Sequence, residues 1–174
     1  MNIKEALVHE HSKKQAEFIG RYVIKSETAF KGLTEIYFGD DQKLAQRAAW
    51  VLSFAVSQKS EIIFPYLKKL ITHLHRSDLH DAVIRNGTKI LETITIPEKH
   101  IGISVDLCFK LLSDPAGSIA VKCYALTTLN NITQKEPGLR HELKLVIDSQ
   151  LPFATAAFLS RAKRSLKMLN KIRE

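Results

Sequence analysis

The sequence predicts an all-α fold, a stack of helical hairpins, and two observations carry this prediction. In residues 98–133, apolar side chains recur at helical spacing on both sides of a polar turn at residues 113–117. Basic residues early in four predicted helices then recur about 40 residues apart, a period typical of helical repeats: Arg47, Arg85, Lys122 and Arg161. Because neither helix of a pair can bury its apolar face alone, neighbouring pairs are expected to stack.

Taken in chain order, the pattern predicts an N-terminal helix and four hairpins. The helix is expected over residues 3–24, and the hairpins over residues 26–57, 61–95, 98–133 and 137–172. Gly39 and Asp40 end the first helix of the first hairpin. The helix over residues 42–57 is the most apolar and is expected to lie between neighbours, and Pro65 is compatible with a first turn or a kink. Residues 1–174 are expected to form one domain.

Composition supports a folded protein with a sizeable core. The chain has 174 residues, 45% of them hydrophobic, and a net charge of +8. No uncharged run approaches the roughly 20 residues that cross a bilayer. The first residues contain no hydrophobic stretch of the kind found in signal peptides, so a cytoplasmic location is expected. Cys108 and Cys123 lie on or beside apolar stripes, which predicts two reduced core cysteines rather than a disulfide.

The turns between helices repeat together with the basic residues. Asp40, Asp78 and Asp114 each precede a basic residue of the following helix by a similar interval. In this pattern, and in Asp114 being followed by proline, residues 26–169 resemble the HEAT-repeat family. The resemblance implies a right-handed superhelix whose second helices line the concave surface. The fourth hairpin departs from the pattern, since its turn at residues 149–152 has no acid.

The paired acids and bases predict a structural ladder that joins successive turns by hydrogen bonds. Its expected members are Asp40, Arg47, Asp78, Arg85, Asp114 and Lys122.

Basic charge is concentrated on the second helices, where few acidic residues stand. If these helices face inward, the groove is basic and attracts an acidic protein surface or a polyanion. The expected binding residues are Lys43, Trp50, Lys89, Tyr124, Lys163, Arg164 and Lys167. Trp50 and Tyr124 fall on the polar side of their helices, where aromatic rings serve as hot spots for proteins or stack on bases. Two simpler interpretations stay open: Trp50 fills a junction between hairpins, and Lys163, Arg164 and Lys167 form a solvated outer face.

Catalytic motifs are lacking in the sequence. The pairs His9 with His11 and His73 with His75 are two residues apart, which directs their rings to different faces of a helix and disfavours a shared metal. We therefore expect no catalytic residue, no metal and no cofactor. The favoured function is a non-enzymatic interaction module that binds an acidic protein or peptide. The alternatives are DNA or RNA binding through the same groove and, less favoured, an enzyme similar to the HEAT-like DNA glycosylases. The sequence leaves the oligomeric state open.

Overall fold

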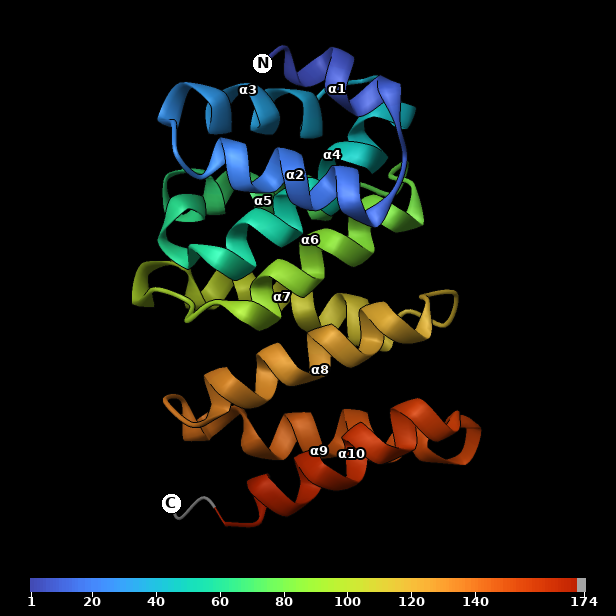
Figure 1. Ribbon diagram of the computed structural model, residues 1–174. Coiled ribbons are helices and arrows are strands. Elements are labelled where there is room, and N and C mark those ends of the chain that lie inside the picture. Colours follow the sequence, from blue (N-terminus) through green and yellow to red (C-terminus); the bar gives the residue numbers. More distant parts are fainter. Residues whose placement is uncertain (172–174) are drawn as a thin grey trace. The chain divides into compact units, whose positions relative to one another are not determined.

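The computed structural model describes residues 1–171, which form α-helices and short 3-10 segments without a β-strand (Figure 1). The prediction of an all-α fold is confirmed. The chain divides into two compact units, an amino-terminal unit of Met1–Ile94 and a carboxy-terminal unit that begins at Thr95. Each unit is compact on its own, and a single domain over residues 1–174 stays a prediction.

The amino-terminal unit contains three successive helix pairs, α1 with α2, α3 with α4, and α5 with α6. The elements are α1 (Ile3–His9), α2 (Lys13–Val23), α3 (Glu27–Tyr37), α4 (Gln42–Gln58), the 3-10 segment η1 (Ser60–Tyr66), α5 (Leu67–Leu74) and α6 (Asp81–Thr93). The second helices pack on one another, α2 on α4 and α4 on α6. Pro65 lies inside η1 and so precedes the α-helical part of its segment, as the sequence allowed.

The prediction of one helix over residues 3–24 is wrong, because the structure has two helices there. The hydroxyl of Ser12 accepts a hydrogen bond from the Gln15 backbone N–H at 3.1 Å, and this N-cap starts α2. The side-chain amide of Gln15 donates to the carbonyl oxygen of Ala6 at 2.9 Å, which satisfies a carbonyl at the end of α1. The first segment is therefore itself a helical pair, which precedes the four predicted hairpins.

The carboxy-terminal unit contains two further pairs, α7 with α8 and α9 with α10. Its elements are η2 (Glu98–His100), α7 (Ile101–Ser113), α8 (Ile119–Thr133), η3 (Pro137–Leu139), α9 (Arg140–Gln150), η4 (Leu151–Phe153) and α10 (Ala156–Leu169). Here too the second helices pack together, α8 on α10. The last helix begins at Ala156 because Thr155 caps it. The predicted end of the last hairpin, Ile172, lies outside the described residues.

The core of the amino-terminal unit is centred on α4. Its apolar face is buried along its whole length, from Leu44 to Val56. Both α2 and α6 pack on this helix, and Gly20 of α2 faces it closely. The ring of Phe54 on α4 lies where a Cβ at Gly20 would stand. The prediction that this helix lies between neighbours is confirmed.

The two cysteines lie in the core of the carboxy-terminal unit. Cys108 of α7 and Cys123 of α8 are both buried and not joined in a disulfide. Burial raises the pKa of the Cys108 thiol to about 12, so this thiol stays protonated at neutral pH. The prediction of two core cysteines without a disulfide is confirmed.

No helix within residues 1–171 has the length and apolar character that crossing a membrane requires.

Candidate aromatic and basic binding site

Trp50 lies at the centre of a small pocket in the amino-terminal unit. The pocket has a volume of about 190 Å³ and is formed by α4, α6 and the turn between α1 and α2. Its lining residues are His11, Gln46, Trp50, Ala82, Arg85 and Asn86. Trp50 is half-buried, so part of its side chain is accessible to solvent. The aromatic ring and the polar side chains around it give this hollow both an apolar and a polar surface.

The imidazole of His11 forms the edge of the pocket nearest α2. Its ring centroid is 5.4 Å from that of Trp50, and the two rings meet edge to face at 70°. His11 can reach Trp50 because the chain turns between α1 and α2, where the Ser12 cap fixes the backbone.

The same turn is held in place by Arg47 of α4. Its guanidinium Nη1 donates to the carbonyl oxygens of Leu7, at 2.5 Å, and Val8, at 2.9 Å. These carbonyls belong to the last turn of α1, where no intrahelical donor is available. Arg47 therefore joins the end of α1 to the second helix of the next pair through backbone carbonyls, and not through the elbow acid that the ladder prediction named.

Arg85 of α6 supplies the basic wall of the pocket. It is exposed, and no ion pair of the described residues joins it to Asp78, its expected ladder partner. Asp78 instead accepts two hydrogen bonds from Arg76 in the same turn, at 2.9 Å and 2.6 Å. These bonds with Arg76 lower the pKa of Asp78. Among the described residues, the structure shows no bond for the predicted ladder role of Arg85, and it places Arg85 in the lining of the Trp50 pocket, which the sequence did not predict.

The remaining ladder residues also lack the predicted partners. Asp114 accepts a hydrogen bond from the backbone N–H of Ala116 at 2.9 Å, within its own turn. Asp40 is exposed, and the neighbouring Asp41 caps α4 instead, accepting from Leu44 N–H at 3.0 Å. Lys122 is half-buried on α8, without an ion pair to an elbow acid among residues 1–171. Asp78 and Asp114 thus accept hydrogen bonds within their own turns, whereas the charge of Asp40 acts on Arg76 of the next turn.

Exposed charges of both signs surround the Trp50 pocket. Lys89 lies one turn after Arg85 on the same face of α6, and Lys43 lies two turns before Trp50 on α4. Asp81 lies one turn before Arg85, and Glu10 is adjacent to His11. The two lysines are exposed, as expected of binding residues, and the field at this site is mixed rather than uniformly basic.

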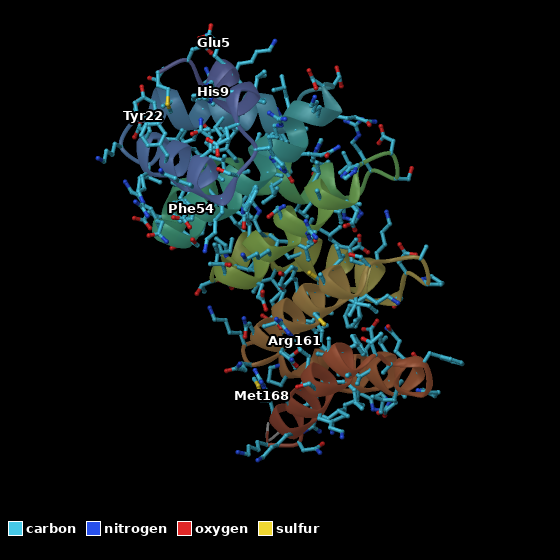
Figure 2. All side chains as sticks on the ribbon, turned by 45° about the vertical axis from the view of Figure 1, so that its right-hand side comes forward. Glu5, His9, Tyr22, Phe54, Arg161 and Met168 are labelled. Atoms are coloured by element: carbon cyan, nitrogen blue, oxygen red, sulfur yellow. The ribbon has the colours of Figure 1, made fainter. Side chains whose placement is uncertain are left out.

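Tyr124 in the carboxy-terminal unit is covered by an arginine. The guanidinium carbon of Arg161 lies 5.6 Å from the centroid of the Tyr124 ring, a cation–π contact. Arg161 extends from α10 toward α8 (Figure 2) and donates to the Cys123 carbonyl at 3.2 Å and to the Thr127 hydroxyl at 2.5 Å. Because this guanidinium occupies one approach to the ring, Tyr124 is less suited than Trp50 to stacking on a ligand.

The last three predicted binding residues, Lys163, Arg164 and Lys167, are exposed on α10. They lie on the side of the helix opposite its buried residues Phe158, Ala162, Ser165 and Leu169. This placement is compatible with the solvated outer face that the sequence left open, and equally with a cationic surface for a partner.

Sequence reasoning missed four lining residues of the pocket: His11, Gln46, Ala82 and Asn86. Treating residues 3–24 as one helix placed His11 in mid-helix, far from any pocket edge. The signal that could have located it is Ser12 followed by a helical pattern, which is an N-cap signature. Among residues 1–171, no group of three or more histidine, cysteine or acidic side chains is arranged to hold a metal.

Comparison with known proteins gives one match. The model of the HEAT repeat domain matches residues 3–169. That range includes α1 and α2, in agreement with a helical pair at the amino terminus. Neither the curated proteins nor the solved structures include a match to this chain.

Proposed function

Because the chain belongs to the HEAT repeat domain family, we propose that it is a non-enzymatic interaction module that binds a protein or peptide. Members of this family generally act as protein-interaction scaffolds, and stacked repeats present extended surfaces suited to that role. The observation that carries the proposal for this chain is the pocket in which Trp50 is flanked by His11 and Arg85.

Trp50 has the properties of an interface hot spot. Tryptophan and arginine are the residues whose truncation most often weakens protein interfaces, and they act from partly enclosed positions. Trp50 and Arg85 share one pocket of about 190 Å³, a size that admits a side chain rather than a large cofactor. The exposed Lys43 and Lys89 nearby would then form the rim of the interface.

The proposal is tested by selecting peptides from a random displayed library on the full chain. Peptides that bind the wild type are then titrated against Trp50→Ala by calorimetry. We expect Trp50→Ala to weaken binding at least 10-fold, because removal of a hot-spot tryptophan commonly costs about 2 kcal/mol or more. The matched control is Phe153→Ala, since Phe153 is an aromatic residue that is 89% exposed and belongs to the other unit. If no peptide is selected, or if both variants bind equally well, the proposal fails.

Nucleic-acid binding is a second candidate function, favoured by the charges of the carboxy-terminal unit. The charged residues of its second helices are all basic: Lys122, Arg161, Lys163, Arg164 and Lys167. Lys163→Glu combined with Lys167→Glu should then abolish binding of labelled single- or double-stranded oligonucleotides, measured by fluorescence anisotropy. Binding to the wild type should also fall steeply with added salt, because phosphate neutralisation releases counterions. Absence of binding at low salt would exclude this function.

A further inference from the structure

Three arginines occupy nearly the same position in their helical pairs, but only two of them are used to hold the fold. Arg47 donates to carbonyls of Leu7 and Val8, and Arg161 donates to the carbonyl of Cys123. In both cases the acceptor lies in the preceding pair, 38 to 40 residues earlier. The repeat position therefore favours a structural bond whenever an acceptor is within reach.

Arg85 is the exception at this position. Within residues 1–171 its guanidinium makes no hydrogen bond or ion pair, and its side chain is exposed. One difference from Arg161 is visible in the sequence of α4. Arg161 donates to the hydroxyl of Thr127, 34 residues earlier, whereas the residue 34 positions before Arg85 is Val51, which is buried and has no polar side-chain atom. The guanidinium of Arg85 thus keeps its donors for a ligand.

The surroundings of Arg85 restrict what that ligand is. The pocket that it shares with Trp50 has a volume of about 190 Å³, enough for one side chain of a peptide. Gln46 lines the same pocket and has an amide donor, whereas the amide of Asn86 already donates to the carbonyl of Ala82 at 2.8 Å. A flat indole beside a guanidinium suits a group with an apolar stem and a charged planar end.

We propose that this pocket binds one glutamate or aspartate side chain of the peptide partner. The Arg85 guanidinium donates two parallel hydrogen bonds to the carboxylate, the geometry in which arginine binds carboxylates best. The indole of Trp50 covers the methylene carbons of the bound side chain. This inference rests on the proposed function, since it names the group of the partner that the pocket recognises.

The charges near the pocket favour a single carboxylate over a polyanion. Asp81 is one turn from Arg85 and Glu10 is adjacent to His11, so a phosphate backbone crossing the site would pass two like charges. One carboxylate held against Arg85 is also attracted by Lys89, one turn further along α6.

The test uses Trp50 as a reporter, because it is the only tryptophan of the chain. The probes are the tryptophan-free peptides selected on the full chain and synthetic versions in which each acid is replaced in turn by its amide. We expect saturable changes of Trp50 fluorescence with the selected peptides, and a loss of affinity of about 10-fold or more when one particular acid becomes an amide.

Variants of the protein complete the test. Arg85→Gln should weaken binding about as much as the critical acid-to-amide exchange, and the two changes together should cost no more than either alone. Arg85→Lys should bind the peptides nearly as weakly as Arg85→Gln, because an ammonium group lacks the two-pronged geometry that a carboxylate matches. Asp81→Asn should strengthen binding by removing a like charge. The matched control Lys68→Gln removes an exposed cation of α5 in the same unit and should leave affinity unchanged.

The outcomes separate this inference from the proposed function. If peptides bind and require Trp50 but tolerate every acid-to-amide exchange, or if Arg85→Gln and Lys68→Gln act alike, the carboxylate inference is overturned while the interaction module stands. If selected peptides bind equally well without Trp50, both fail. If labelled oligonucleotides change Trp50 fluorescence at lower concentrations than any peptide, the ligand is a nucleic acid and the inference is likewise overturned.

Discussion

The hydroxyl oxygen of Tyr37 lies 2.7 Å from the position that a Cβ atom at Gly87 would occupy. Both residues are buried, Tyr37 on α3 and Gly87 on α6. A Cβ there would also stand 2.7 Å from a methyl group of Leu74, which is buried as well. Gly87 is therefore the residue that lets α6 approach the aromatic cluster at the end of α3.

Gly87→Ala is expected to destabilise the protein, although alanine favours helices. The overpacking against Tyr37 and Leu74 should cost about 1–3 kcal/mol, which exceeds the gain of about 1 kcal/mol in helix propensity. The measurement is the free energy of unfolding in urea. Gly102→Ala is the matched control, because nothing lies within 4 Å of a Cβ at that helical glycine. It should stabilise slightly, and a stable Gly87→Ala would contradict the packing described for α6.

Tyr37→Phe should partly rescue Gly87→Ala. The Tyr37 hydroxyl is buried without a hydrogen-bond partner in the described structure, and burial alone raises its pKa. Removal of this hydroxyl therefore breaks no hydrogen bond and relieves one of the two closest contacts of the new methyl group. A double-mutant cycle in urea should show a coupling of about 0.5 kcal/mol or more. If the two changes were strictly additive, the contact with Leu74 alone would account for the loss of stability in Gly87→Ala.

Arg161→Ala should lower the free energy of unfolding by about 1–3 kcal/mol. The change removes hydrogen bonds to Cys123 and Thr127 and the contact with the Tyr124 ring. Arg164→Ala is the matched control, since Arg164 is exposed on the same helix and should change stability by less than about 0.5 kcal/mol. Equal effects of the two variants would mean that only net charge matters on α10.

Arg47→Met should loosen α1 more than the rest of the chain. Methionine keeps much of the apolar stem but cannot donate to the carbonyls of Leu7 and Val8. We expect faster amide hydrogen exchange in α1 and little change in α5, whose contacts do not involve Arg47. Arg85→Gln, at the same repeat position, should leave α1 exchange unchanged. Uniform acceleration across the unit would contradict a local role for Arg47.

His73 should make stability depend on pH. Burial lowers its pKa below 6.5, and the positive charges of Arg76 and Lys69 lower it further, partly offset by Asp78. The His73 imidazole therefore binds a proton more readily in the unfolded chain than in the folded chain, so the free energy of unfolding should fall as pH drops below about 6.5. His73→Gln should flatten this part of the profile. His141→Gln, which changes an exposed histidine, should leave the slope as in the wild type.

Much of the fold could be predicted from the sequence because helical periodicity is a local property. The spacing of apolar residues located α3 to α10 within a few residues, and the acids at the turns marked the joints between helices. The exception was the break at Glu10–Ser12, where a short polar turn lies between two stretches of the same helical character. The structure resolves this ambiguity, because the Ser12 hydroxyl accepts a hydrogen bond from the Gln15 backbone N–H and so caps α2.

Periodicity could not predict the partners of the charged residues. A helical wheel shows which side of a helix a residue occupies, but a partner is set by which helix lies opposite and at what distance. Arg47, Arg85 and Arg161 look alike in sequence, yet the acceptors within their reach differ. The pairing of each base with an elbow acid therefore could not be inferred reliably from spacing.

The sequence by itself determined that this chain folds into paired helices with apolar faces turned inward, because burial of periodic apolar residues leaves few other solutions. Only the tertiary structure decided that Trp50 shares a pocket with His11 and Arg85, and that Tyr124 is covered by Arg161. The physical reason is that polar contacts depend on distances of a few ångströms between separate helices, and such distances are set by packing of the whole unit.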